Sequence, residues 1–270
     1  ASVTGAVTAG QTIAQADLQY LRFTPAANAN GAAYANLTFR VVDDGGTSDG
    51  GVNTDQSANT LTIDVTAVND APAGADITLT TLEDTAYIFS AANFGFSDTL
   101  DSPANTLSAV IITTLPAAGS LTLVAPASVT GAVTLGQTIT AADIPHLRFT
   151  PALNANGAAY TSFTFQVVDN GGTANAGVNT DQTPNTVTFD VTAVNDAPAG
   201  TNATLTTLED TTLNFTAASF GFSDTADVPA NNLQAVIIDT TPAAGSLFLV
   251  APASVTGAVT AGQTIAQADL

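Results

Sequence analysis

The sequence predicts an all-β protein made of tandem antiparallel β-sandwich modules with Greek-key connections. Three observations support this fold class. A long segment repeats at a fixed spacing, short alternating strands are separated by turn signals, and no helix longer than one turn is indicated. Evenly spaced short strands of this kind are typical of sandwiches, and a long repeat indicates an array.

The repeat is clearest in the nine residues 66–74, which return unchanged as 192–200, 126 positions later. About three quarters of the aligned positions are identical between copies. A period of this length indicates whole domains in series rather than a solenoid of small units. We therefore expect the C-terminal part of a module at 1–70, a complete module at 71–196 and the N-terminal part of another at 197–270. The chain is expected to be a window on a longer array.

Residues 1–70 contain four predicted strands, at 7–13, 21–25, 34–42 and 61–68. A short turn is expected at 14–18. In the third strand, Tyr34, Leu37, Phe39 and Val41 mark most of one face, and a bulge near Asn36 would reconcile the break in alternation. The loops between the strands are rich in Ala, Asn, Asp and Gly.

The complete module contains about eight predicted short strands, at 77–82, 87–89, 107–114, 120–124, 133–139, 147–149, 160–168 and 187–194. The loop 93–105 carries aromatic residues expected to anchor it in the core. The segment 116–119 has Pro and Gly where a turn requires them. A module of ~125 residues is large enough to bury a core of its own.

The charge balance restricts the partners of the chain. Three arginines and no lysine stand against 23 acidic residues, giving a net charge of −20. Nucleic acid and anionic lipid are bound through Lys and Arg, so neither is an expected partner. The 45% hydrophobic content argues against disorder. There is no cysteine for a disulfide or a thiolate metal site, and no apolar run long enough for membrane insertion.

Acidic and amide side chains recur in four clusters in each copy, which makes them candidate metal ligands. One set consists of Asn69, Asp70, Glu83, Asp84, Asp98, Asp101, Asn105 and Asp43, and the corresponding set consists of Asn195, Asp196, Glu209, Asp210, Asp224, Asp227, Asn231 and Asp169. Calcium takes six to eight oxygen ligands of these types. In a sandwich, the linker, the first strand and an end loop meet at one pole, so we expect Ca2+ there. The alternative is that these residues cap turns and loop ends.

Other polar residues are assigned plainer roles. Asp55 and Asp181 are expected at solvated loop tips, and Asp64 and Asp190 on the outer face of the last strand. His146 is the only histidine and corresponds to Tyr20, so it cannot serve a function common to the modules. No Gly-rich phosphate loop leads from a strand into a helix. The sequence therefore predicts a protein that is not an enzyme.

The motifs, taken in order, resemble a known family. They are Val-Asn-Asp-Ala-Pro at 68–72, Leu-Glu-Asp-Thr at 82–85, Phe-Ser-Asp-Thr-x-Asp-x-Pro-Ala-Asn at 96–105, Phe-Thr-Pro-Ala-x-Asn-x-Asn-Gly at 149–157 and Val-Val-Asp-x-Gly-Gly-Thr at 167–173. This order resembles the cadherin-like and immunoglobulin-like (Ig-like) tandem repeats of giant bacterial surface adhesins exported by type I secretion, of the VCBS or tandem-95 type. The full Asp-Arg-Glu and long linker motifs of cadherins are missing.

The resemblance implies extracellular modules that calcium rigidifies, with neighbouring modules as the partners. We therefore expect a non-enzymatic structural repeat array on the bacterial cell surface, acting as the extender or stalk of an adhesin or as a surface filament. Two alternatives remain open. One is a self-assembling extracellular fibre of identical chains, in which a head such as 197–270 is completed by a tail such as 1–70. The other is an adhesive module that binds a glycan or a protein.

Overall fold

The computed structural model describes residues 5–270, in which the regular structure consists of β-strands and short 3-10 helices. The all-β class is therefore confirmed. The 3-10 helices are η1 (Gln15–Tyr20), η2 (Ser48–Gly50), η3 (Ala91–Phe94), η4 (Ile144–His146), η5 (Ala174–Ala176), η6 (Ala217–Phe220) and η7 (Gln267–Asp269). Across this described range, no helix has the length and apolarity needed to cross a membrane.

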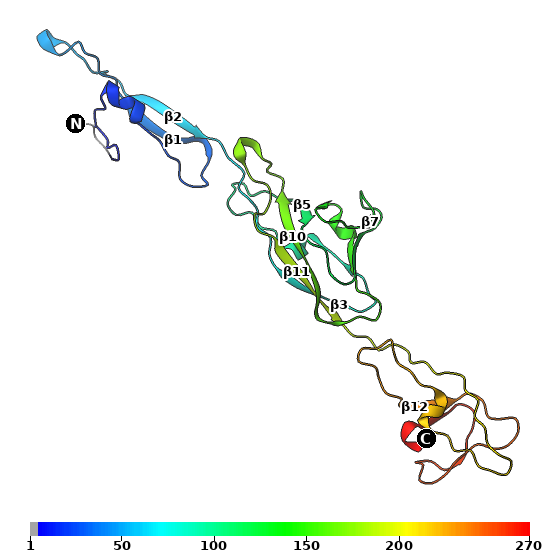
Figure 1. Cartoon of the computed structure of the whole chain (residues 1–270). Coiled ribbons are helices and arrows are strands. Elements are labelled where there is room, and N and C mark those ends of the chain that lie inside the picture. Colours follow the sequence, from blue (N-terminus) through cyan, green and yellow to red (C-terminus); the bar gives the residue numbers. More distant parts are fainter. Residues whose placement is uncertain (1–4) are drawn as a thin grey trace. The chain divides into compact units, whose positions relative to one another are not determined.

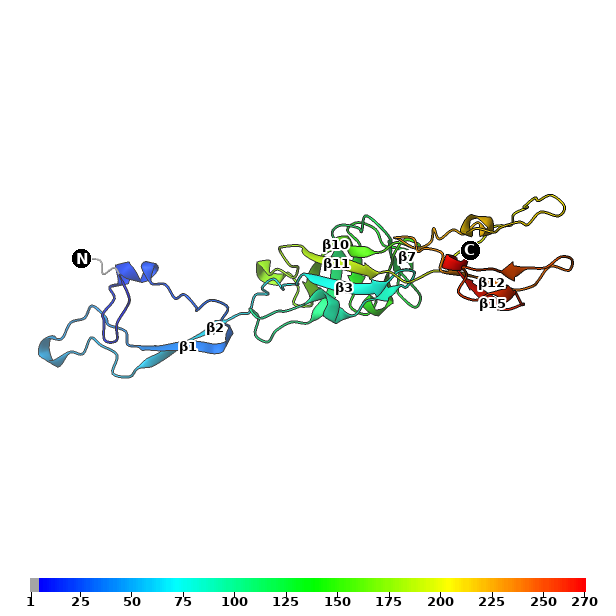
Figure 2. The same ribbon diagram turned by 90° about the horizontal axis from the view of Figure 1, so that it is seen from below.

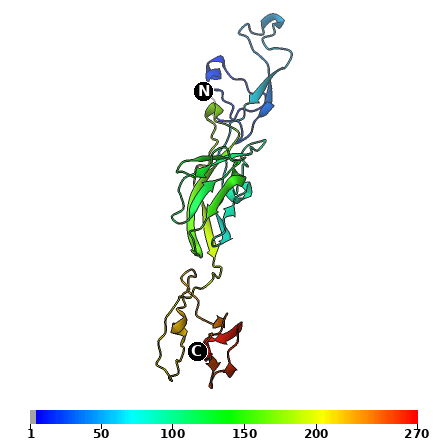
Figure 3. The same cartoon turned by 90° about the vertical axis from the view of Figure 1, so that its right-hand side faces the viewer.

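Nine strands between residues 77 and 192 form two sheets. Their bounds are β3 (Ile77–Leu82), β4 (Tyr87–Ile88), β5 (Leu107–Ile112), β6 (Ser120–Leu123), β7 (Gly131–Ala132), β8 (Thr138–Thr140), β9 (Leu147–Thr150), β10 (Gly157–Asp169) and β11 (Asn185–Thr192). The larger sheet has the order β3-β11-β10-β5-β8 and the smaller one β4-β9-β6-β7. Figures 1 and 3 show the strands of the larger sheet side by side.

A core of aromatic side chains lies between these sheets. Along β10, inward and outward residues alternate, and Phe163 and Phe165 are fully buried. Phe189 of β11 stacks on Phe149 of β9, with ring centroids 3.9 Å apart and planes 18° apart. Phe89 meets both Phe163 and Phe189 edge to face. Aromatic rings from both sheets therefore share one core, and the edge-to-face contacts of Phe89 have the geometry that ring quadrupoles favour.

One strand pair corrects the expectation of purely antiparallel pairing. β3 runs parallel to β11, with Ile77 opposite Val187 and Leu79 opposite Phe189. The pairs β10–β11, β4–β9 and β6–β9 are antiparallel. The parallel pair joins the first and last strands of the segment 77–192, which run in the same direction between the two Asn-Asp linkers. A local strand pattern carries no information on this direction.

A bulge in β10 and in its counterpart β1 (Gly31–Phe39) is held by the last strand. The register with β2 (Asn59–Val65) shifts between Gly31 and Ala35, close to the predicted bulge near Asn36. Ala33 has a φ of 50°, and its N–H donates to Asp64 at 2.6 Å. Ala159 and Asp190 repeat this contact at 2.7 Å. Asp64 is exposed as predicted and Asp190 is half-buried, but each carboxylate also holds a strained backbone in place, which the predicted surface role did not include.

The two parts at the chain's ends carry fewer strands than their repeats do. The predicted strands at 7–13 and 21–25 are absent, although 147–150 is β9. β9 is held by β4 and β6, and residues 5–70 contain no counterparts of these strands. The segment 203–208 has no strand either, whereas the equivalent 77–82 is β3. The remaining pairs there are β12 (Ala235–Ile238) with β15 (Gln263–Ala266) and β13 (Phe248–Leu249) with β14 (Gly257–Ala258) (Figure 2).

The contacts divide the chain into two compact units. The first comprises the residues up to Gly74, Phe96–Ala109 and Val167–Thr183. The second comprises Ala75–Gly95, Val110–Gln166 and Pro184–Leu270. Each unit contains one of the Asn-Asp linkers together with the acidic side chains that surround it.

A tight approach at Gly119 gives a stability prediction. Its φ is +75°, and an added Cβ would lie 2.6 Å from the Thr150 carbonyl oxygen and 2.9 Å from the Phe149 ring. Gly136 has a φ of +77° with open space around it. Both Gly→Ala changes incur the left-handed penalty of about 1–2 kcal/mol. Gly119→Ala should cost about 1–3 kcal/mol more in urea unfolding because of overpacking. Equal losses for the two variants would contradict the close contact.

Candidate metal centre

The first cluster surrounds the linker residues Asn69 and Asp70 in the first unit. Asp98, Asp101 and Asn105 come from the loop before β5, and Asp169 ends β10. Asp169 is buried because it continues the inward-facing alternation of β10. Five of these six residues belong to one predicted set, whereas Asp169 belongs to the other set, and hydrogen bonds connect all six.

Amide groups bridge the acids of the first cluster. Asn69 Nδ2 donates to both carboxylate oxygens of Asp169, at 3.3 and 3.2 Å, and to the Val178 carbonyl at 2.6 Å. Asn105 Nδ2 donates to Asn69 Oδ1 and, at 3.2 Å, to Asp101 Oδ2. The linker side chain therefore joins the end of β10 to the loop before β5.

Two acids of the first cluster, Asp98 and Asp101, lie in environments that disfavour their ionised form. Asp98 Oδ2 accepts the Asn105 N–H at 2.6 Å, while Asp98 Oδ1 is buried without a hydrogen-bond partner among residues 5–270. Burial raises the pKa of Asp101 above its usual value. The charges of Asp98 and Asp70 add to the rise, against the lowering effect of the hydrogen bond from the Asp70 N–H. A cation bound here would give the free Asp98 oxygen a partner and offset the repulsion among these carboxylates.

The second cluster lies in the second unit, around Asn195 and Asp196. Asp224, Asp227 and Asn231 repeat the loop geometry of the first cluster. Asp227 accepts the Asp196 N–H at 3.1 Å, and Asn231 Nδ2 donates to Asn195 Oδ1 at 2.9 Å. Asn231 N–H donates to Asp224 Oδ2 at 2.7 Å. The repeat therefore builds the same linker and loop arrangement twice.

Glu83 and Asp84 approach this linker from the end of β3. Glu83 is almost fully buried, where its oxygens accept the Val194 N–H at 2.5 Å and Asn156 Nδ2 at 2.9 Å. Asp84 accepts the Asn154 N–H at 3.0 Å. The parallel pairing of β3 with β11 leaves Glu83 beside the strand that leads into the linker, since the Glu83 N–H donates to the Thr192 carbonyl.

Three carboxylates of the second cluster are close enough to share one ion. Oxygens of Glu83, Asp196 and Asp227 all lie within 4.8 Å of one another. Asp196 Oδ2 and Asp224 Oδ1 are buried and have no hydrogen-bond partner in the described part of the chain. Burial raises the pKa of Asp196, and the charges of Asp84, Asp227, Glu83 and Asp224 raise it further. Like charges without a cation therefore disfavour ionised Asp196.

Three predicted ligands lie apart from these groups. Asp43 is exposed and accepts the N–H of Gly45 at 2.9 Å, as in an Asx turn. Glu209 and Asp210 are exposed in a turn where the Thr211 hydroxyl donates to the Glu209 carbonyl. Their counterparts Asp169, Glu83 and Asp84 are held by strands that these three residues lack. The prediction that all members of each repeat set converge is therefore wrong for these three. It is also wrong for Glu83, Asp84 and Asp169, each of which lies at the linker of the other set.

Asp181 was predicted to lie at a solvated loop tip, and the structure places it elsewhere. It is buried, and its Oδ2 accepts the Gly74 N–H at 2.9 Å, four residues after the first linker. The loop-tip prediction is wrong for this residue. Asn156, which lies outside the predicted ligand sets, donates from Nδ2 to Glu83 Oε2 at 2.9 Å. The sequence signal for the role of Asp181 is that Asp181 and its counterpart Asp55 both lie in the unchanged motif Gly-Val-Asn-Thr-Asp-Gln.

The donor set of both clusters consists of carboxylate and carboxamide oxygens. Such hard ligands suit Ca2+ or Mg2+ and do not suit softer transition metals. The buried oxygens without partners at Asp98, Asp196 and Asp224 are available for a cation.

Comparisons of the chain with protein-family models, curated proteins and solved structures returned no match.

Proposed function

We propose that this chain is a non-enzymatic structural repeat array of Greek-key sandwich modules, whose linkers are rigidified by calcium. In this proposal the array is the extender of an extracellular bacterial adhesin or of a surface filament. The cadherin-like and Ig-like resemblance supports this setting. The partners of each module are then its neighbours in the array.

The observation that carries the proposal is the second cluster. Glu83 belongs to the segment before the linker, Asp196 to the linker and Asp227 to the segment after it, and their oxygens lie within 4.8 Å of one another. A cation held by all three ties the two segments to the linker. Without it, the three charges repel, and the linker is free to open.

The chemistry of the site favours calcium over magnesium. Glu83, Asp84, Asn195, Asp196, Asp224, Asp227 and Asn231 would supply oxygens to the ion. Calcium accepts an irregular shell of six to eight oxygens, whereas magnesium requires near-ideal octahedral geometry and retains several waters. A crowded group of carboxylates and amides on a linker fits the first description.

Distance measurements between spin labels test the proposal directly. The chain has no cysteine, so Ser162→Cys and Thr241→Cys, both at exposed positions, give two specific attachment sites on either side of the second linker. We expect a broad distance distribution in EDTA and a narrow one in millimolar calcium, with little narrowing in magnesium. Equal widths in EDTA and calcium would overturn the proposal.

A further inference from the structure

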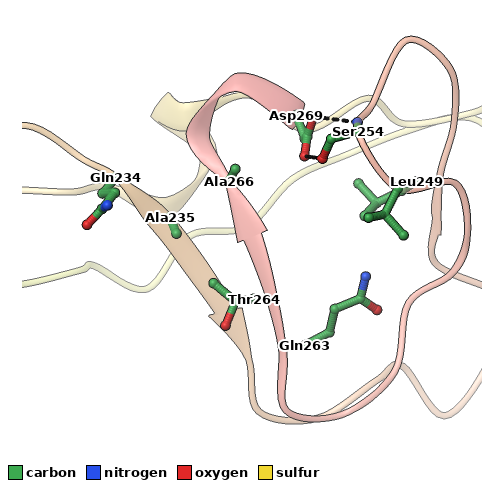
Figure 4. Close-up of a pocket in the computed structure, with 9 residues that line it drawn as sticks. Gln234, Ala235, Leu249, Ser254, Gln263, Thr264, Ala266 and Asp269 are labelled. Carbon is green, nitrogen blue, oxygen red and sulfur yellow. Dashed lines mark hydrogen bonds between the residues drawn. The ribbon is translucent and has the colours of Figure 1, made fainter.

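Side-chain oxygens in several loops of this chain accept backbone N–H groups and hold the loop in place. Asp269, for example, accepts the Ser254 N–H at 2.8 Å (Figure 4). At Asn170 a carboxamide takes this role, since Asn170 Oδ1 accepts the Thr106 N–H at 2.9 Å. A carboxamide differs from a carboxylate in its chemistry, because it carries a nitrogen that can leave as ammonia.

Asn170 is followed by a glycine that the packing of the linker requires. A Cβ added at Gly171 would overlap the Asn69 side chain. Asn69 cannot move aside without losing its hydrogen bonds to Asp169 and Val178. A glycine that follows an asparagine also leaves its own backbone nitrogen unobstructed, because it has no Cβ beside it. The linker therefore places an open backbone nitrogen directly after an exposed asparagine.

The polar contacts of this pair suit an attack of the Gly171 nitrogen on the Asn170 side chain. The Gly171 N–H donates to Asp169 Oδ1 at 2.8 Å, so an acceptor already contacts the proton that the nitrogen must lose. The Thr106 N–H on Asn170 Oδ1 stabilises the negative charge that develops on this oxygen when its carbon is attacked. The nucleophile and the electrophile therefore each have the hydrogen-bond partner that favours their reaction.

We propose that Asn170 is a site of spontaneous deamidation, at which the chain modifies itself without an enzyme. The Gly171 nitrogen gives up its proton and bonds to Asn170 Cγ. The bond from Cγ to Nδ2 breaks, and Nδ2 takes up a proton and leaves as ammonia, so that a succinimide ring remains. Water then opens the ring to aspartate, or to isoaspartate, in which the main chain runs through the side-chain carbonyl. The net reaction consumes one water and releases one ammonia, with no redox step.

The two products have different consequences for the first linker. Isoaspartate lengthens the main chain by one carbon just before Gly171, which is packed against Asn69 and has no room to shift toward it. Aspartate leaves the main chain unchanged and keeps an oxygen for the Thr106 N–H. The corresponding residue of the other repeat is Asp44, so the repeat accepts an aspartate at this position. We therefore expect isoaspartate, and not aspartate, to loosen the linker, whether or not the cluster holds calcium.

The pair Asn156-Gly157 provides a matched comparison within the same chain. Asn156 Nδ2 donates to Glu83 Oε2 at 2.9 Å, so this carboxamide is held by its nitrogen rather than by its carbonyl oxygen. A carboxylate that accepts from Nδ2 adds electron density to the carboxamide, which makes its carbon less open to attack. A difference of one hydrogen bond corresponds to a rate ratio of about 3- to 10-fold in favour of Asn170.

Peptide mass spectrometry of the 270-residue chain, aged at mildly alkaline pH and physiological temperature, tests the proposal. Chymotryptic cleavage after tyrosine and phenylalanine separates Asn156 from Asn170, and electron-transfer fragmentation distinguishes aspartate from isoaspartate. We expect deamidation at Asn170 to be about 3- to 10-fold faster than at Asn156 in the folded chain. In concentrated guanidinium chloride the two rates should converge, because both pairs are then plain Asn-Gly sequences. Equal rates in the folded chain, or a slower reaction at Asn170, would overturn the proposal.

Two substitutions at position 170 test the consequence for the linker. The thermal midpoint of the parent chain should fall as isoaspartate accumulates. Asn170→Gln should keep a constant midpoint during the same ageing, because its longer side chain closes a ring far more slowly. Asn170→Asp should melt close to the fresh parent protein, since it carries the charge of the product without the longer main chain. An equal fall in the parent and in Asn170→Gln would reject the predicted effect of isoaspartate on the linker.

Discussion

Millimolar calcium is expected to raise the thermal midpoint of the chain, and excess EDTA to lower it again. A ligand present at about 100 times its Kd, which binds only the native state, adds about 2.7 kcal/mol. Each kcal/mol corresponds to about 2–4 °C for a domain of 150–250 residues. Magnesium should produce a smaller rise because it is reluctant to lose its waters. Differential scanning calorimetry in the three buffers measures the effect.

The substitution Asp196→Asn should shift the thermal midpoint in opposite directions in EDTA and in calcium. The raised pKa of Asp196 means that its ionised form destabilises the folded state at neutral pH, and stability recovers as the pH falls through the folded value. In EDTA the variant should therefore melt above the parent protein. In calcium it should lose much of the ligand-induced rise, because a carboxylate ligand is gone.

Asp239→Asn is the matched control for this reversal. Asp239 is exposed, and its substitution removes the same charge outside both clusters. It should melt like the parent protein in each buffer. The cluster assignment would be rejected if Asp196→Asn and Asp239→Asn shifted the calcium-dependent rise equally.

Phe189→Ala should cost about 3–5 kcal/mol of unfolding free energy. Phe189 is fully buried and makes ring contacts with Phe149, Tyr87 and Phe89. Its removal therefore takes one member from each of these pairs and leaves a cavity between the two sheets. Urea unfolding followed by near-ultraviolet circular dichroism measures the loss.

The control for the core prediction is Leu153→Ala. Leu153 is 81% exposed, so its truncation should change the free energy by no more than about 0.5 kcal/mol. A loss below about 1 kcal/mol for Phe189→Ala would mean that the aromatic contacts do not carry the stability of this core.

Much of the fold between residues 77 and 192 could be predicted from alternation and turn residues. The strands at 77–82, 107–112 and 147–150 fall where the pattern placed them. The same pattern fails at 21–25, where an identical Leu-Arg-Phe-Thr-Pro forms no strand. A strand needs a partner for its backbone groups, and the residues of a strand do not reveal whether that partner is present.

The candidate site was predictable where the ligands lie close in sequence. The Asx and loop residues Asp98, Asp101 and Asn105 could be grouped by spacing, because one short loop carries them all. Glu83 reaches Asp196 only through the parallel pairing of β3 with β11. The buried Asp181 accepts the N–H of Gly74, which lies 107 residues earlier in the chain. Both contacts depend on strand order, which composition and spacing do not encode.

The parallel pairing of β3 and β11 has a mechanical consequence. Tension applied through the two linkers pulls β3 from its first residue and β11 from its last, in opposite directions along the strand axis. Six residue pairs, from Ile77–Val187 to Leu82–Thr192, are then loaded together in shear. A hairpin pulled at its open end would instead break its hydrogen bonds one at a time. The arrangement therefore resists extension along the chain far better than it would resist peeling.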